Sequence, residues 1–187
     1  MITLPNEILG KGNERVCYLH PQDPEKIIKI SYDREKGRSK QSDIEITYYK
    51  ELQKRKNQKN LYKHLPRFYG EIETDKGKGM IVDLVKDFDG TVSKSFEYYM
   101  KRDGIKPYRD ELEEYKQYFL DNLIIFNYGM MPKNILRRRL DENNAELVLI
   151  DGLGDVAFFK FPNKIPYFAR KKILRRWIKF FNKYIKD

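Results

Sequence analysis

The chain has 187 residues, with 38 Lys or Arg against 28 Asp or Glu and a formal net charge of +10. Its charges are interleaved with apolar residues, which make up 40% of the sequence, so a folded protein is expected rather than a disordered one. No apolar run of about 18 residues could cross a bilayer, and residues 1–7 lack the features of a signal peptide. With Cys17 as the single cysteine, an intrachain disulfide is excluded. We expect a cytoplasmic protein, although secretion without a cleaved signal would leave the same pattern.

The first 85 residues alternate short apolar runs with turns, which is typical of β-strands. Strands are predicted at 8–9, 16–18 and 26–30, separated by a glycine-containing turn and by the Pro-bounded turn at 20–24. A helix is predicted over about 40–57, because Ile44, Tyr48 and Leu52 recur every four residues. A hairpin of residues 68–72 and 79–85 follows, with its turn near residues 75–77.

After the sequence Asp87-Phe88-Asp89-Gly90 the apolar spacing changes from two residues to about 3.6. This spacing predicts helices at 93–102 and 108–122, a loop at 127–134, a strand at 146–150 and an amphipathic helix at 166–185. We therefore predict one α+β domain over residues 1–187, with a β-rich lobe at 1–85 and a reduced, helical lobe at 86–187.

The pair of glycines in Gly10-Lys11-Gly12 lies between two predicted strands, where a phosphate-covering hairpin would place it. Glycine lets backbone N–H groups approach phosphate oxygens, although most such pairs are simple turns. A Rossmann dinucleotide site is disfavoured because a strand, not a helix, follows the glycines.

Lys29 and Glu45 form a second candidate pair. Lys29 interrupts an apolar strand, where a buried charge would need a partner, and Glu45 faces inward if Ile44 and Tyr48 mark the packed side of the next helix. A Lys on the third strand paired with a helix Glu is how protein kinases hold nucleotide phosphates. The alternative is a solvated Lys beside a surface Glu.

Two oxygen-bearing residues in the second lobe are candidates for binding Mg²⁺. Asn134 follows a loop, and Asp151 directly follows the predicted strand. Amide and carboxylate oxygens from adjacent strands are hard ligands that suit this ion. The alternative for Asp151-Gly152 is an ordinary turn.

Taken together, these segments resemble the YrbL family (PhoP regulatory network protein YrbL), small bacterial proteins related to protein kinases. The resemblance runs from about residue 9 to 155 and is carried by Leu9 to Gly12, Arg15 to Tyr18, His20-Pro21, Asp23-Pro24, Ile28 to Ile30, Glu45, Tyr48-Tyr49, Asp87 to Gly90, Pro132 to Leu136, Asp151-Gly152 and Gly154. It implies a kinase-like, two-lobed fold, and from the residues above we predict that this fold binds ATP and Mg²⁺. On this pattern Arg15 replaces the third glycine of the loop, Cys17 covers adenine, and Asp83 to Val85 form the hinge that offers backbone groups to adenine.

The sequence departs from the kinase pattern in its catalytic loop. Counting back from Asn134, the position of the catalytic Asp holds Gly129, and Met131 stands where a Lys is usual. Asp155 is the nearest carboxylate that could replace the missing base, its alternative being a solvated turn residue, and Lys133 could supply the missing cation. We predict an atypical phosphotransferase, or alternatively a pseudokinase that binds nucleotide and acts through a partner.

Most of the net positive charge lies near the C-terminal end, where residues 164–187 hold nine Lys or Arg and one acid, a net of +8 out of +10. The predicted helix at 166–186 is expected to pack by its apolar stripe with a solvated basic face, or else to bind a protein substrate or another acidic partner. No nucleic-acid motif accompanies it. His20 and His64 are too few for a zinc site and are expected to be structural.

Overall fold

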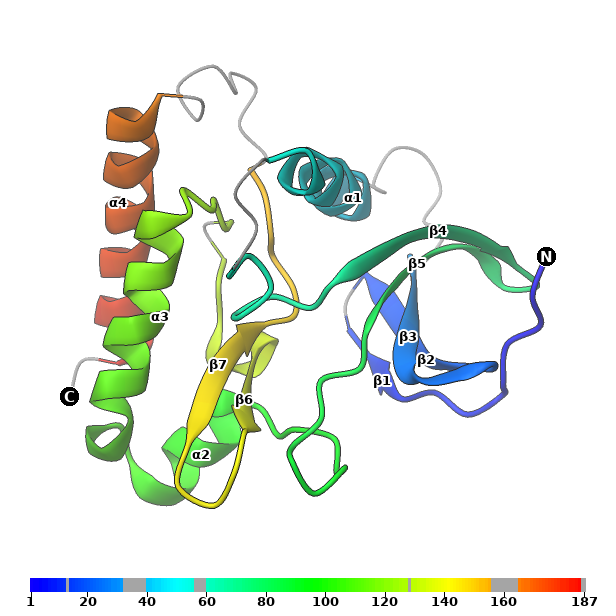
Figure 1. Ribbon diagram of the computed structural model, residues 1–187, viewed down its shortest axis with the longest axis horizontal. Helices are drawn as coiled ribbons and strands as arrows, with labels where there is room; N and C mark the ends of the chain where they lie inside the picture. The colour runs from blue at the N-terminus through cyan, green and yellow to red at the C-terminus, as the bar shows by residue number, and fades with distance from the viewer. Residues whose placement is uncertain (13, 32–39, 56–59, 128, 156–164, 186–187) are drawn as a thin grey trace. The chain divides into compact units, whose positions relative to one another are not determined.

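The computed structural model describes residues 1–12, 14–31, 40–55, 60–127, 129–155 and 165–185 (Figure 1). The protein has a mixed α+β fold, as predicted, with helices α1 to α4, a five-stranded sheet and a two-stranded sheet. The chain divides into two compact units. The first comprises Met1–Lys54 and Pro66–Val85, and the second comprises Arg55–Leu65 and Lys86–Asp187.

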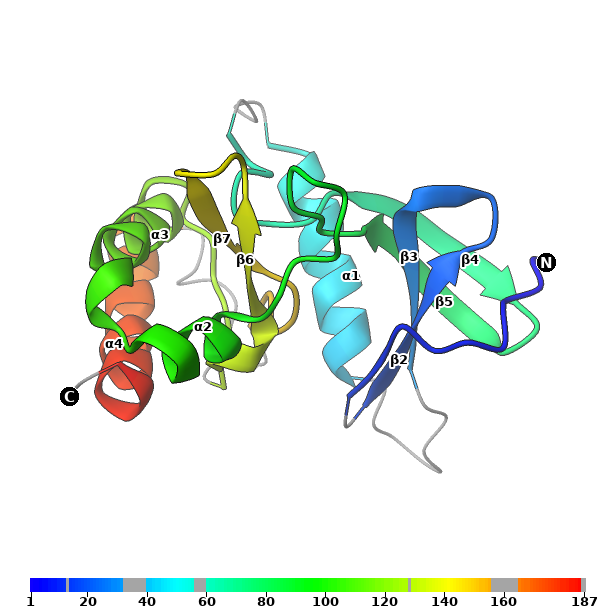
Figure 2. The same cartoon turned by 90° about the horizontal axis from the view of Figure 1, so that it is seen from below.

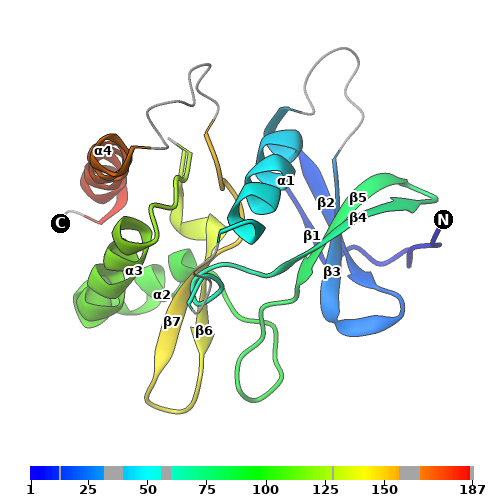
Figure 3. The ribbon, with the colours of Figure 1, turned by 45° about the horizontal axis from the view of Figure 1, so that its top comes forward.

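The first unit is an antiparallel sheet with one helix. Its strands are β1 (Gly10–Lys11), β2 (Arg15–His20), β3 (Asp23–Ser31), β4 (Phe68–Thr74) and β5 (Gly77–Asp83), in the order β1-β2-β3-β5-β4. Helix α1 (Lys40–Gln53) lies beside this sheet in Figures 2 and 3. The five strands and the helix occur in the predicted order, but β1 starts two residues later than expected. Helix α1 ends four residues before the predicted limit, because the stripe of Tyr48 and Leu52 would continue at Lys56, which cannot extend an apolar face.

The sheet of the first unit has two chemically different faces. One face carries an apolar cluster of Leu4, Val16, Tyr18, Ile28 and Ile30. On the other face, the strand register places Cys17, Lys29 and Met80 side by side on β2, β3 and β5. Residues that alternate along a strand point to opposite faces, so the polar candidates Arg15, Cys17 and Lys29 share the face that lacks this cluster.

In its described residues, the second unit combines three helices with a hairpin. Its elements are α2 (Phe96–Asp103), the 3₁₀ turn η1 (Lys106–Tyr108), α3 (Arg109–Asp121), the 3₁₀ turn η2 (Pro132–Asn134), β6 (Ile135–Arg139), β7 (Ala145–Leu149) and α4 (Pro166–Tyr184). Helix α2 starts three residues later than predicted, because Ser95 caps it by accepting the N–H of Tyr98. Strand β6 was given no bounds from sequence, since its three consecutive arginines hide the strand pattern.

Helix α3 packs against both β7 and α4 (Figures 1 and 2). Aromatic rings form the centre of this core, where Tyr115 lies 6.1 Å from Trp177 and 4.8 Å from Phe119 between ring centroids. Ile173, on the same face of α4 as Trp177, is fully buried. No helix in the described parts of the chain is long and apolar enough to cross a membrane.

Candidate functional site

In the first unit, two cations meet one buried carboxylate. Lys29 Nζ on β3 lies 3.4 Å from Glu45 Oε1 on α1, and Arg15 Nη1 on β2 lies 2.7 Å from Glu45 Oε2. The side chains are 7%, 5% and 1% exposed for Arg15, Lys29 and Glu45. The structure thus pairs Lys29 with Glu45 and excludes the alternative of two solvated surface charges.

The charge state of Glu45 follows from these contacts. Burial raises its pKa, but the positive charges of Arg15 and then Lys29 outweigh burial and hold the pKa below the usual glutamate value. Glu45 is therefore ionised at neutral pH, and the three side chains together carry one net positive charge. Such a cluster can attract a further anion.

The glycine loop is a short turn between β1 and β2. Leu9 N–H donates to Cys17 O at 2.9 Å, and Gly12 N–H donates to Arg15 O at 2.8 Å. A Cβ added at Gly10 would meet nothing within 4 Å, and one at Gly12 would meet Arg15 O at 3.6 Å, among the described residues. Neither glycine has the positive φ that favours glycine. Packing among the described residues therefore does not require glycine at these two positions.

The predicted hinge residues are held within the first unit. Asp83 accepts the backbone N–H of Arg67 and the hydroxyl of Tyr69, each at 2.7 Å. Burial, together with the nearby Asp83 carboxylate, raises the pKa of Tyr69 to about 12. Leu84 N–H donates to Glu25 O at 2.8 Å, and Val85 is buried. These contacts fix the chain after β5, and the proposed role of Asp83 and Val85 toward adenine stays a prediction.

In the second unit, the two predicted metal ligands lie at the same end of the β6–β7 hairpin. Ile135 pairs with Leu149, and Ile150 N–H donates to Asn134 O at 2.9 Å, so Asn134 faces the residue that precedes Asp151. Both side chains are partly exposed. No three His, Cys, Asp or Glu side chains form a metal cluster in the part of the chain that the structure describes. One amide and one carboxylate fit Mg²⁺, which usually takes its remaining oxygens from water and substrate phosphates.

Asn127 connects the predicted catalytic loop to the segment after β7. Its N–H donates to Gly152 O at 2.7 Å, and its Oδ1 accepts the N–H of Gly129 at 2.9 Å. Gly152 has a φ of +90°, and an added Cβ would lie 2.9 Å from Asn127 Nδ2, so glycine is required there for two reasons. Gly129 itself, which stands where the kinase pattern predicts the catalytic Asp, is exposed.

Asp155 has a structural environment. It is 3% exposed, which shows that the solvated-turn alternative was wrong. Its Oδ2 lies 2.7 Å from Lys172 Nζ and its Oδ1 lies 2.6 Å from Arg176 Nη2, both on α4. Arg176 also donates to the carbonyl oxygen of Phe126. Both carboxylate oxygens therefore join α4 to the rest of the unit, an arrangement that suits a structural ion pair better than a catalytic base.

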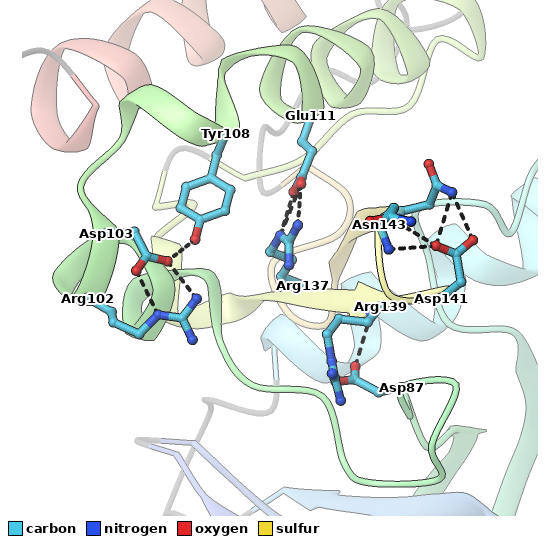
Figure 4. A network of polar contacts seen from close by, with 10 residues as sticks. Asp87, Arg102, Asp103, Tyr108, Glu111, Arg137, Arg139, Asp141 and Asn143 are labelled. Carbon is cyan, nitrogen blue, oxygen red and sulfur yellow. Dashed lines mark hydrogen bonds and ion pairs between the residues drawn. The ribbon is translucent and has the colours of Figure 1, made fainter.

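The sequence Asp87-Phe88-Asp89-Gly90 forms a loop clamped to β6 by Arg139 (Figure 4). Asp87 accepts Arg139 Nε at 2.6 Å and the hydroxyl of Ser93 at 2.6 Å, while Arg139 Nη2 also contacts Asp89. Hydrogen bonds with Thr91 lower the pKa of Asp89 to about 2. This segment, one carrier of the family resemblance, is thus explained by its contacts with β6.

Arg137, two residues earlier, joins β6 to α3. It makes a forked ion pair with Glu111, with Nε 2.9 Å from Oε2 and Nη2 2.6 Å from Oε1, and it lies 5.1 Å from the ring centres of Tyr99 and Tyr108. Figure 4 shows this pair beside the contact of Arg102 with Asp103. Side chains of this strand therefore fix its neighbours rather than offering free charge for a ligand.

Comparison with known proteins identifies the family to which the chain belongs. The family model described as PhoP regulatory network protein YrbL matches residues 2–185. Two curated relatives, each carrying the name uncharacterized protein YrbL and found in Escherichia coli (strain K12) and Shigella flexneri, are 32% identical over 176 residues. These alignments cover 92% of this chain and 82% of each relative. The chain belongs to the YrbL family, as its motifs predicted.

Sequence reasoning missed two residues that organise these sites. Arg15 was placed at a loop position, yet its guanidinium reaches Glu45 of α1. Asn127 was passed over, although it stands two residues before Gly129 and holds that loop. The position of Arg15 directly before a predicted strand is a sequence signal that could have predicted its role. No local sequence feature predicts the role of Asn127.

Proposed function

We propose that the protein binds ATP with Mg²⁺ and is an atypical, protein-kinase-like phosphotransferase. One observation carries this proposal: Lys29 on the third strand contacts Glu45 on the next helix, and both are buried. Protein kinases use a Lys and Glu in these positions to hold nucleotide phosphates. Gly10, Lys11 and Gly12, at the turn before β2, would cover the phosphates with their backbone N–H groups.

The proposed Mg²⁺ ligands belong to the second unit. Asn134 and Asp151 lie at one end of the β6–β7 hairpin and offer two oxygens, while the nucleotide phosphates and water would supply the rest. Mg²⁺ bound there would neutralise charge on the phosphates. We propose accordingly that the two units correspond to the lobes of a kinase-like fold, and that the protein works in the cytoplasm.

The missing catalytic Asp limits the expected rate. Gly129 has no side chain to orient a substrate hydroxyl, and Asp155 is committed to two ion pairs. General-base assistance is typically worth about 10²–10⁴-fold, whereas positioning and charge neutralisation carry most of phosphoryl transfer. Slow transfer is therefore compatible with this site. The alternative function, favoured by the exposed Gly129, is a pseudokinase that binds nucleotide and regulates a partner.

Isotope transfer separates these functions. The protein is incubated with ATP labelled at the γ or the α phosphate, and wild type is compared with Lys29→Ala and Asp151→Ala. Label from the γ position that is lost in both variants supports the phosphotransferase, and label from the α position would mean nucleotidyl transfer instead. ATP binding without any transfer supports the pseudokinase. In the phosphotransferase case, Gly129→Asp should raise the rate by about 10²-fold or more.

A binding role for α4 is favoured by its outer face. Leu174, Ile178 and Phe181 are 41%, 56% and 40% exposed, and Lys171 and Arg175 lie beside them. The described helix contains no Asp or Glu. An exposed apolar stripe bordered by positive charge suits an acidic protein surface that also carries apolar side chains. We therefore propose that α4 binds a protein substrate or an acidic regulatory partner.

Binding to polyglutamate at about 0.15 M salt tests the electrostatic part of this proposal. Lys171→Glu combined with Arg175→Glu should weaken binding at least tenfold, because both charges lie on the proposed surface. The matched control is Lys101→Glu combined with Lys106→Glu, which makes the same change of net charge on exposed residues elsewhere in the second unit. Equal losses in the two double variants would show that only net charge matters and would contradict a specific surface on α4.

A further inference from the structure

The two oxygens of Glu45 are shared unequally between two cations. Arg15 approaches Oε2 to 2.7 Å, whereas Lys29 approaches Oε1 to 3.4 Å. Lys29 donates a hydrogen bond to Oε1, whereas the contact of Arg15 with Oε2 is an ion pair without hydrogen-bond geometry. Because Coulomb attraction grows as two charges approach, Arg15 is nevertheless the closer positive charge to Glu45, and hence to α1, and it lowers the pKa of Glu45 more than Lys29 does.

Arg15 reaches this position by crossing the sheet. It pairs with Ser31 of β3 in the strand register, and its Nη1 lies 3.9 Å from Met80 Sδ on β5. The side chain thus extends from β2 over β3 and is 7% exposed. Its guanidinium is planar and charged at every physiological pH, so its hold on a carboxylate does not depend on protonation.

We propose that Arg15 is the residue that docks α1 onto the sheet, and that the ammonium group of Lys29 exchanges its contact with Glu45 for an anion while Arg15 keeps α1 in place. The second half of this proposal rests on the proposed function, while the first half does not. With Lys29 alone, an anionic ligand that drew its ammonium away would leave the buried Glu45 carboxylate with less compensation, and α1 would be loosened. With Arg15 in place, Glu45 keeps its closer partner and α1 stays docked before and during binding.

This arrangement predicts different consequences for the removal of Arg15 and of Lys29. Removing Arg15 should free α1, whereas removing Lys29 should leave α1 docked but abolish the attraction for an anion. If the usual Lys–Glu contact docked the helix, the two effects would be reversed. Arg15 is accordingly a positioning residue, and Lys29 is the residue that contacts the ligand.

Hydrogen exchange of the full-length protein tests the docking. We expect the amides of α1 to exchange at least tenfold faster in Arg15→Met than in wild type, and less than threefold faster in Lys29→Met. The amides of α3, in the second unit, serve as an internal reference and should not change. Arg15→Lys keeps the charge and should restore part of the protection. Should Arg15→Met fail to fold, Arg15→Lys is compared with Lys29→Met in its place. In either comparison, an effect of Lys29→Met on α1 as large as that of the Arg15 variant would overturn the proposal.

Calorimetric titration with Mg·ATP tests the division of roles. Lys29→Met should lose at least a hundredfold in affinity with α1 still protected, and Arg15→Met should lose less, in step with its loss of α1 protection. A loss of affinity in Arg15→Met with α1 fully protected would show that Arg15 binds the phosphates directly. A gain of affinity for Mg·ATP in Arg15→Met would show that Arg15 blocks the site. Either result contradicts the proposal. If wild type binds no ATP, the proposed function fails, yet the exchange experiment still decides whether Arg15 docks α1.

Discussion

Replacing Asp155 with Asn should destabilise the second unit strongly. The carboxylate is 2% exposed and contacts Lys172 and Arg176, whose side chains are 15% and 4% exposed. Removing one member of a buried ion pair typically costs about 3–5 kcal/mol, because the remaining charge stays in a poorly solvated site. For a chain of this size, that loss lowers the melting temperature by roughly 10 °C. The protein should nevertheless still fold at low temperature, because Asn keeps the shape of the side chain.

Trp177 makes this prediction easy to measure, since it is the single tryptophan and stands next to Arg176 on α4. Its fluorescence during urea unfolding reports the docking of α4, and the midpoint should fall by about 1.5–2.5 M for a slope of about 2 kcal/mol per M. Glu142→Gln, the same chemical change at an exposed residue of this unit, is the control and should shift the midpoint little. A loss below about 1 kcal/mol in Asp155→Asn would refute the structural role and return Asp155 to the candidates for a catalytic base.

Three further predictions concern other contacts. Folding lowers the pKa of Glu45, so the ionised side chain contributes to stability above the usual value of 4.5, and this contribution is lost as the pH falls through the lower folded value. In urea unfolding followed by circular dichroism, the difference in stability between wild type and Glu45→Gln should therefore shrink below pH 4.5. A difference that stays constant with pH would contradict this. Gly152→Ala should cost about 1–3 kcal/mol from backbone strain and the close contact with Asn127, whereas Gly129→Ala should cost less than half as much in the same thermal melt. Arg139→Gln should cost about 1.5–3 kcal/mol by releasing the buried Asp87, and an unchanged melting temperature would show that the loop after β5 is held by other contacts.

The sequence predicts most elements of the fold because their signals are local. Apolar runs bounded by Gly and Pro locate β2 to β5, and the spacing of Tyr115 and Phe119 locates α3. The strand β6 was not predicted, because Arg137 and Arg139 resemble a solvated basic run in the sequence. Their partners, Glu111 and Asp87, lie 26 and 52 residues away in sequence, so only the tertiary fold explains why strand arginines are partly buried.

The candidate site, like the fold, could be predicted only in part from the sequence. Lys29 could be matched with Glu45 because a charge inside an apolar strand needs a partner, and the structure brings the two together. Sequence could not reveal that Arg15 takes the other oxygen, because its burial is created by a helix that begins 25 residues later. For the same reason the sequence indicated only a candidate base or a solvated turn residue at Asp155, although partners 17 and 21 residues further along the chain enclose it.

The most direct test of the account is the affinity of the purified protein for Mg·ATP, measured by calorimetry in wild type, Lys29→Ala and Asp151→Ala. The proposed site predicts measurable binding in wild type, at least a tenfold loss in each variant, and dependence of the affinity on Mg²⁺ that is lost in Asp151→Ala. Lys106→Ala, a change at an exposed residue of the second unit that has no role in the proposed site, is the control and should bind as wild type does. Absence of binding in wild type, or equal affinity in all variants, would contradict a nucleotide site built on Lys29 and Asp151.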